Sequence, residues 1–164
     1  MSDPGIPHSD PKVLRVVEAG RSRGIQVRPI SFAGHTRTAA DAARQVGCEV
    51  GQIVKSLVFM AGDRPVLLLV SGANRVDLGK AASALGLGDL DKADADSARA
   101  ASGFSIGATP PFGHATEIPV LMDADLLTHD QVWAAAGRPD TVFPLSPEDL
   151  RRATDAPTAE LKQE

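Results

Sequence analysis

Two short hydrophobic runs near the middle of the chain form its clearest pattern. Residues 52–60 (QIVKSLVFM) and 65–70 (PVLLLV) are rich in Ile, Val, Leu and Phe, which favour the half-buried surface of a sheet. Both runs are too short and too rich in β-branched residues for a helix. Because the Gly62-Asp63 pair between them is typical of a hairpin turn, we predict two antiparallel strands.

The rest of the chain alternates between helical and extended patterns. Ser9-Asp10-Pro11 is a typical helix start, and Gly24 is expected to end that helix. Further helices are expected at about 39–46, 77–85, 93–101 and 147–154, and further strands at 25–30, 118–122 and 141–145. Segment 131–136 is compatible with a helix or a strand, and the polar residues after 154 are expected to fray.

These elements predict one α/β domain over residues 1–164, with a core at about 11–155. The length of 164 residues and the hydrophobic content of 43% suit a single buried core. Helices and strands interleave, but the expected hairpin makes at least one strand pair antiparallel. The expected fold is therefore a mixed sheet with helices around it, not a doubly wound parallel sheet.

Charge and composition exclude several classes of protein. The net charge of −4 and the aromatic content of 4% argue against a generally basic or base-stacking nucleic-acid binder. Cys48 is the only cysteine, so the chain cannot form an intramolecular disulfide. The absence of a membrane-length apolar run and of a secretory signal pattern leads us to expect a cytoplasmic protein with no membrane partner.

The common catalytic motifs are also missing. The sequence has no Cys-x-x-Cys pair and no His-Glu-x-x-His, and its four histidines lack the spacing of metal ligands. It has no phosphate-binding P-loop, no Gly-x-Gly-x-x-Gly and no Gly-x-Ser-x-Gly elbow. We therefore expect neither a metal nor a cofactor.

Two features remain as candidates for chemistry. Lys55 lies inside a predicted strand, where a lysine must extend to water, pair with an anion or serve a site. Residues 103–113 (GFSIGATPPFG) contain three glycines and a Pro-Pro pair, which indicates either a surface turn or a loop with exposed main-chain N–H groups. His114 follows this loop, as a structural residue or as part of a site. A cation and main-chain donors together would suit the hydrolysis of an ester by water.

Five segments resemble the YbaK/ProX family of aminoacyl-tRNA deacylases, in order and spacing over about residues 11–155. They are the lysine strand 53–59, the Gly-x-x-Pro-like loop 103–113, and segments 38–43, 72–77 and 119–123. The resemblance implies a compact α/β fold around a mixed, mostly antiparallel, barrel-like sheet surrounded by helices. It also implies editing in trans, in which the ester of a mischarged aminoacyl-tRNA is hydrolysed at the acceptor end.

The resemblance also implies roles for individual residues. Lys55 would orient the terminal adenosine or the aminoacyl group, and the Gly107 and Ala108 amides would hold the carbonyl or the attacking water. The free hydroxyl of the terminal ribose would help to activate that water. The implied substrate-binding residues are Phe32, His35, Thr38, Ser56, Asn74, Thr109, Pro110 and His114.

The substrate implied by the resemblance is a tRNA, such as tRNA-Pro, that carries a small amino acid such as Ala, Cys or Ser. Ala135, Ala136 and Val142 are apolar where some editing members carry polar residues, so the identity of the amino acid does not transfer. Arg37, Arg75 and Lys80 are candidates for phosphate contacts, against the alternative of ordinary solvated charges. An aminoacyl-tRNA synthetase is a second candidate partner. The alternative function is a non-catalytic module that binds an amino acid or nucleotide and assists a synthetase.

Overall fold

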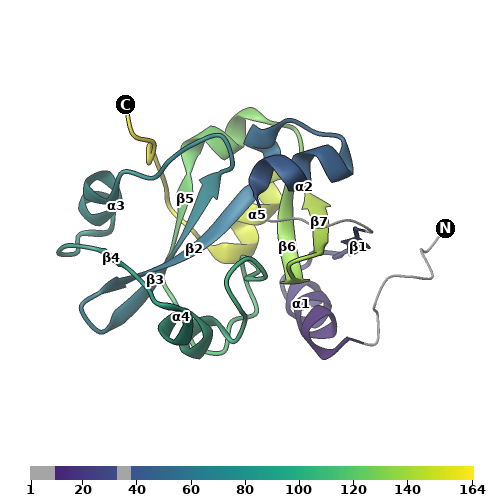
Figure 1. Cartoon of the computed structure of the whole chain (residues 1–164), viewed down its shortest axis with the longest axis horizontal. Coiled ribbons are helices and arrows are strands. Elements are labelled where there is room, and N and C mark those ends of the chain that lie inside the picture. Colours follow the sequence, from purple (N-terminus) through teal and green to yellow (C-terminus); the bar gives the residue numbers. More distant parts are fainter. Residues whose placement is uncertain (1–9, 33–37) are drawn as a thin grey trace.

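Two sheets form the frame of the molecule, and five short helices lie around them (Figure 1). The computed structural model describes residues 10–32 and 38–164. The strands are β1 (Ile30–Ser31), β2 (Val54–Ala61), β3 (Arg64–Ser71), β4 (Asp91–Lys92), β5 (Val120–Asp123), β6 (Val132–Arg138), β7 (Thr141–Leu145) and β8 (Thr158–Ala159). The helices are α1 (Pro11–Arg21), α2 (Ala39–Val46), α3 (Leu78–Leu85), α4 (Ala95–Ser102) and α5 (Pro147–Thr154), with the 3₁₀ turns η1 (Val50–Gln52) and η2 (Ala124–Thr128).

The larger sheet has the order β4-β2-β3-β5-β8. Its centre is the predicted hairpin, because β2 and β3 pair antiparallel along their whole length. Gly62 turns the chain between them with a φ of 66°, a left-handed conformation that favours glycine. β5 and β8 then add in parallel to β3 and to β5, so the sheet is mixed as predicted.

The smaller sheet has the order β1-β7-β6, and all its pairs are antiparallel. A single parallel bridge from Ile53 to Trp133 links it to the start of β2. In the described residues the two sheets do not close on each other, so the barrel-like sheet implied by the resemblance is wrong in this respect. The segment 131–136, which the pattern left open, is extended and forms most of β6.

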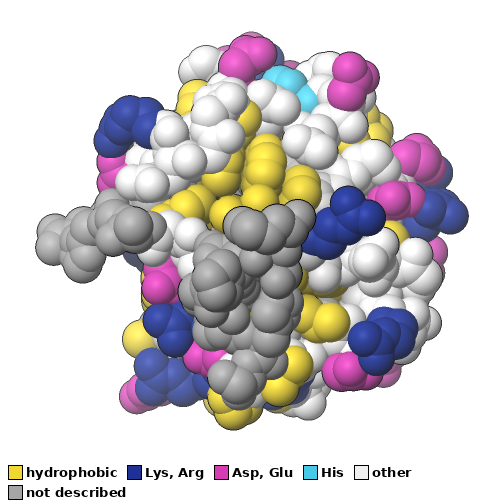
Figure 2. Space-filling model, turned by 90° about the vertical axis from the view of Figure 1, so that its right-hand side faces the viewer, with side chains coloured by type: hydrophobic (Ala, Val, Ile, Leu, Met, Phe, Trp, Pro, Cys, Tyr) yellow, Lys and Arg dark blue, Asp and Glu magenta, His cyan; other side chains and the backbone are white. Residues whose placement is uncertain are grey.

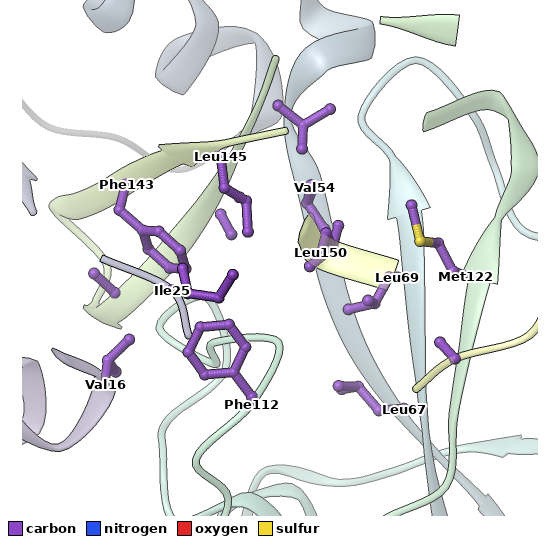
Figure 3. Packing of buried hydrophobic residues seen from close by; sticks show 14 of the residues in the cluster. Val16, Ile25, Val54, Leu67, Leu69, Phe112, Met122, Phe143, Leu145 and Leu150 are labelled. Carbon is purple, nitrogen blue, oxygen red and sulfur yellow. The ribbon is translucent and has the colours of Figure 1, made fainter. Parts of the chain in front are cut away.

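The main core lies between the two sheets (Figure 3). Val54 and Leu69 from the larger sheet face Phe143 and Leu145 from the smaller one, and Phe112 from the glycine-proline loop fills the space beside them. A second cluster, which includes Leu68, Val70 and Leu121, lies on the opposite face of the larger sheet with residues of α3. β3 is therefore covered on both faces, which explains its uninterrupted hydrophobic sequence.

Helix ends follow the expected capping chemistry. Asp10, Thr38, Asp77, Asp94 and Ser146 each accept a hydrogen bond from a main-chain N–H in the first turn of their helix. These caps place α1, α2, α3, α4 and α5 within a few residues of their expected starts.

Two predictions about extended and frayed segments are wrong. Of the strand expected at 25–30, only Ile30 pairs, because Ile25 instead donates its N–H to Gly20 O at the end of α1. The tail after residue 154 does not fray. It contributes β8, and the Leu161 side chain is fully buried in the second cluster, where its apolar surface outweighs the polar residues around it.

The buried Leu161 gives a test of the tail. Replacing Leu161 by Ala is expected to lower the free energy of unfolding by about 2–5 kcal/mol, because it removes apolar surface and leaves a cavity. Leu127→Ala is the matched control, since Leu127 is 41% exposed and should cost well under about 1 kcal/mol. Urea unfolding measures both, and equal losses would contradict a tightly packed tail.

Candidate functional site

Lys55 lies near the start of β2 and is half buried. Its cross-strand partner is Val70, and the side chains of Lys55, Leu57 and Val70 share the face of the larger sheet that packs against α3. The ammonium ends at the edge of that face, where Nζ donates a 2.6 Å hydrogen bond to Asn74 O. Lys55 is therefore held by a main-chain carbonyl in the loop after β3.

That loop is fixed by a buried carboxylate. Asp123, at the end of β5, is 1% exposed and accepts hydrogen bonds from Asn74 Nδ2 at 2.9 Å and from the Ser71 N–H at 3.1 Å. Asn74 Nδ2 also donates to Asp125 Oδ2 at 2.8 Å. Because the end of β3 and the loop after it are both hydrogen-bonded to Asp123, the Asn74 carbonyl that receives the Lys55 ammonium has a defined position.

The surroundings of Lys55 leave its charge without a close carboxylate. In the described part of the chain no ion pair includes Lys55. Burial lowers the pKa of Lys55, the charge of Asp123 acts in the opposite direction, and Arg75 lowers the pKa further. An ammonium that is partly desolvated but not neutralised can interact strongly with an anion or a developing oxyanion.

The edge of β2 beside Lys55 is open. Gly72 N–H donates to Ile53 O, and Ala93 N–H donates to Val58 O, so main-chain groups of β2 point alternately towards β3 and towards the other edge. On that other edge, the main-chain pairing seen in the described residues joins β6 to Ile53, just before β2, and β4 to Phe59 and Met60. Ser56 lies between these two contacts.

Ser56 also carries a polar side chain that lacks a partner. Its Oγ is buried and has no hydrogen bond within the described residues. Ser56 pairs with Leu69 across the hairpin and so faces the main core and the glycine-proline loop, on the opposite face of β2 from Lys55. A buried hydroxyl without a partner is uncommon and suggests a missing ligand or water.

The glycine-proline loop approaches from the side of the smaller sheet. Ala108 O accepts a hydrogen bond from Gly137 N–H in β6, and Ala108 N–H donates to Ser105 O at 3.0 Å within the loop. Gly107 has a φ of 88° and is exposed, and its N–H has no partner among the described residues. Of the two amides singled out from the sequence, the Gly107 amide is thus the one available to a ligand.

Both ends of the loop are fixed by side chains of α1. Lys12 Nζ donates to Gly103 O at 2.9 Å and Arg15 Nε to Gly113 O at 3.0 Å, which attaches the loop to α1. His114 Nε2 lies 2.7 Å from Pro110 O and donates to it. Burial lowers the pKa of His114, although its hydrogen bond to Pro110 acts in the opposite direction.

The other residues implied by the resemblance lie in varied surroundings. Phe32 donates its N–H to Asp140 O beside β7, and Thr38 caps α2 through its hydroxyl. Thr109 and Pro110 are buried within the loop, where Thr109 Oγ1 donates to Ser105 O. His35 and Arg37 lie outside the described residues.

Lys55 and the loop therefore lie on opposite faces of β2. The Lys55 ammonium extends to Asn74 O in the loop after β3, on the α3 face, whereas Ser56 and the glycine-proline loop lie on the main-core face. Two cavities in the described residues lie elsewhere, one beside Pro65 and Pro119 and one beside Gly24 and Val27. A substrate that touches both groups would have to lie across the edge of β2.

Neither a metal centre nor a membrane segment emerges from the described residues. Among them, no group of three or more His, Cys, Asp or Glu side chains could hold a metal ion. None of the helices there is both long and apolar enough for a membrane span. Figure 2 shows hydrophobic side chains gathered in the middle of one face, with Lys, Arg, Asp and Glu intermixed around them.

Sequence reasoning missed two contributions to the site. It gave Asp123 no part in the site, but Asp123 accepts the Asp125 N–H at the start of η2 and also fixes Asn74. It also gave no role to Lys12 and Arg15, which hold the loop. A strand end followed by Asp-x-Asp could have indicated the role of Asp123. Nothing in the sequence spacing linked Lys12 and Arg15 of α1 to loop residues about 90 positions away.

Comparisons with known proteins give a consistent result. A solved structure described as a candidate trans-editing enzyme for prolyl tRNA synthetase superposes with a TM-score of 0.89, at 45% identity over 94% of this chain and 99% of that one. A candidate Cys-tRNA(Pro)/Cys-tRNA(Cys) deacylase of Enterococcus faecalis is 26% identical over 125 residues, 76% of each chain. A proline–tRNA ligase of Acidithiobacillus ferrooxidans is 33% identical over 87 residues, 53% of this chain and 15% of the ligase.

The chain thus spans only a small part of the length of the ligases it matches. The model of the aminoacyl-tRNA editing domain matches residues 33–153, which is most of the chain and includes the Lys55 strand, the Asn74 loop and the glycine-proline loop. Together with the structural similarity, this match shows that the chain belongs to the aminoacyl-tRNA editing domain family.

Proposed function

We propose that this protein hydrolyses the ester of mischarged aminoacyl-tRNA in trans. Water adds to the ester carbonyl, the tetrahedral oxyanion collapses, and the free amino acid leaves the 3′ end of the tRNA. The observation that carries the proposal is a half-buried Lys55 ammonium, held by a carbonyl and not by a carboxylate, in a chain of the editing-domain family.

Lys55 is assigned the role of the electrostatic donor. Its ammonium has donors to spare beyond the 2.6 Å bond to Asn74 O. A fixed cation in partly desolvated surroundings stabilises a phosphate of the terminal nucleotide or the negative charge that develops on the ester oxygen. We therefore place the terminal adenosine beside Lys55.

The Gly107 amide and the Ser56 hydroxyl are assigned to the aminoacyl group. The Gly107 N–H is exposed and would donate to the ester carbonyl, while the Ala108 amide keeps the loop in shape through Ser105. The buried Ser56 Oγ would gain the partner it lacks by binding the amino group or the attacking water. Water activation is assigned to the free ribose hydroxyl of the substrate, since His114 is held by Pro110.

A small amino acid fits this arrangement best. Ala134 and Ala136 on β6 are fully buried. We propose alanine, cysteine or serine, on tRNA-Pro in the first instance, because the relatives named above include a candidate Cys-tRNA(Pro) deacylase and proline–tRNA ligases. A prolyl-tRNA synthetase is the matching partner.

The test is a panel of tRNAs charged with Ala, Cys, Ser and Pro, followed for loss of the ester in the presence of the protein. We expect faster loss for at least one small amino acid on tRNA-Pro than for proline itself. Stabilisation of the protein by an amino acid, with no ester loss across the panel, would show a binding module instead.

Lys55 provides the sharpest variant. Lys55→Met is expected to lower kcat/KM on the best substrate by about 100-fold or more, because it removes a donor to the transition state. The free energy of unfolding should not fall, because burial already disfavours the charged amine in the folded state. Lys92→Met, at an exposed position of β4, is the control. Wild-type activity in Lys55→Met would rule out the role assigned to Lys55.

Ser56 should separate activity from stability. Ser56→Ala removes a buried hydroxyl that has no partner in the described residues, so we expect the free energy of unfolding to stay equal or rise by about 1 kcal/mol. The same change should lower kcat/KM by roughly tenfold if Oγ binds substrate. A variant that is less stable and fully active would show that Ser56 serves the fold and not the site.

A further inference from the structure

Lys12 and Arg15 on α1, and Arg23 just after its end, lack the acidic partner that several other basic residues on the described helices have. Arg21, Arg44, Arg151 and Arg152 each pair with an Asp or Glu three positions before them. Lys12, Arg15 and Arg23 are exposed and make no ion pair within the described residues. In a chain with a net charge of −4, this is a local concentration of uncompensated positive charge.

The same three residues contact the glycine-proline loop. Lys12 Nζ and the Arg15 guanidinium lie over the Phe104 ring, 5.5 Å and 5.1 Å from its centroid, and the Arg23 guanidinium lies 5.5 Å from the centroid of Phe112. Figure 1 shows α1 and α4 on the two sides of this loop. The three cations therefore border the loop that carries the Gly107 amide.

These side chains are held in place and still have donors available. Lys12 uses one ammonium hydrogen on Gly103 O, and Arg15 uses Nε on Gly113 O. Arg23, two residues beyond α1, donates from Nη1 to Ala19 O in the last turn of α1 and to Ser22 Oγ at its C-cap. Because the heads are already fixed by rings and carbonyls, less side-chain entropy is lost when an anion binds.

The spacing suits a polyanion. At 1.5 Å per residue, α1 rises about 14 Å from Lys12 to Arg21, and Arg23 follows two residues later. A duplex passes several phosphates over that length. The acceptor stem of a tRNA leads directly to the 3′ end, so a stem along α1 would direct its end towards the neighbouring loop.

We propose that Lys12, Arg15 and Arg23 form a phosphate-binding face that receives the acceptor stem of the RNA substrate. This assignment rests on the proposed function for its choice of RNA. It differs from the sequence-based candidates, since Lys80 is engaged by Glu160, Glu164 and Lys162 O.

Binding can be tested without any chemistry. The probe is a labelled, uncharged acceptor-stem hairpin that ends in CCA, titrated by fluorescence anisotropy over a series of salt concentrations. The triple variant K12Q/R15Q/R23Q is expected to bind at least tenfold more weakly, and the slope of log K against log[salt] should fall by about 2–3, since each lost phosphate contact contributes about 0.7–0.9.

A matched variant controls for net charge. R21Q/R151Q/R152Q removes the same three charges from positions with acidic partners, and its affinity should stay within about twofold of wild type, because such surface pairs contribute little. Equal weakening by both triple variants would overturn the proposal. So would equally tight, variant-sensitive binding of a poly-glutamate peptide, because the face would then recognise acidic protein.

The integrity of the loop is checked with a substrate that has no stem. Hydrolysis of aminoacyl-adenosine should be unchanged in Arg23→Gln, which keeps the Lys12 and Arg15 contacts to the loop, whereas hydrolysis of the charged tRNA by this variant should show a raised KM. Arg23→Gln alone, which leaves both loop carbonyl contacts intact, should reproduce part of the loss in hairpin affinity. If no ester is hydrolysed by wild type, the proposed function fails but the hairpin titration still decides this inference. Wild-type hairpin affinity and salt slope in the triple variant would refute it.

Discussion

The position of Lys55 depends on the buried carboxylate of Asp123. A carboxylate that is 1% exposed must have its lone pairs satisfied, and here the donors are Ser71 N–H, Asn74 Nδ2 and Asp125 N–H. These bonds fix the loop after β3, and the loop in turn supplies the carbonyl that receives the Lys55 ammonium. The proposed role of Lys55 thus depends on the buried carboxylate of Asp123, which the substrate would not contact.

The second constraint is the way the two sheets meet. In the described residues, the strands of the two sheets pair only through the bridge from Ile53 to Trp133. Beyond it, the main chain at Ser56 has no paired strand on the edge away from β3, and Phe104 and Phe112 of the glycine-proline loop pack in the core between the sheets. An open edge of this kind is usually avoided in proteins, so its presence beside Lys55 supports a binding role for it.

The sequence predicted much of this fold because many signals were local. The hairpin 52–70, the helices at 39–46 and 147–154, and the strand 141–145 depend on neighbouring residues, and each was found close to its place. The strand at 25–30 and the order of the tail were missed, because Ile25 bonds back to Gly20 at the end of α1 and Leu161 is buried against elements far away in the sequence. Periodicity carries no information about such partners.

The site was predicted in the same uneven way. Lys55 and the loop 103–113 stood out by residue type. Alternation along β2 places Lys55 and Ser56 on opposite faces, but only the pairing with β3 shows which face of the sheet each side chain occupies. The attachment of the loop to α1 through Lys12 and Arg15 was beyond any sequence signal. His35 remains a prediction, because it lies outside the described residues.

The parallel pairing of β8 with β5 also affects how the chain reaches its folded state. Residues 158–163 leave the ribosome roughly 100 residues after Lys55, and until then β5 presents an unpaired edge that another nascent chain could occupy. In the tail, Leu161 O also accepts a hydrogen bond from Asp77 N–H, and Gln163 N–H donates one to Arg75 O. The contacts that hold the Lys55 loop are therefore complete only after residues 158–163 have been synthesised and have joined the sheet.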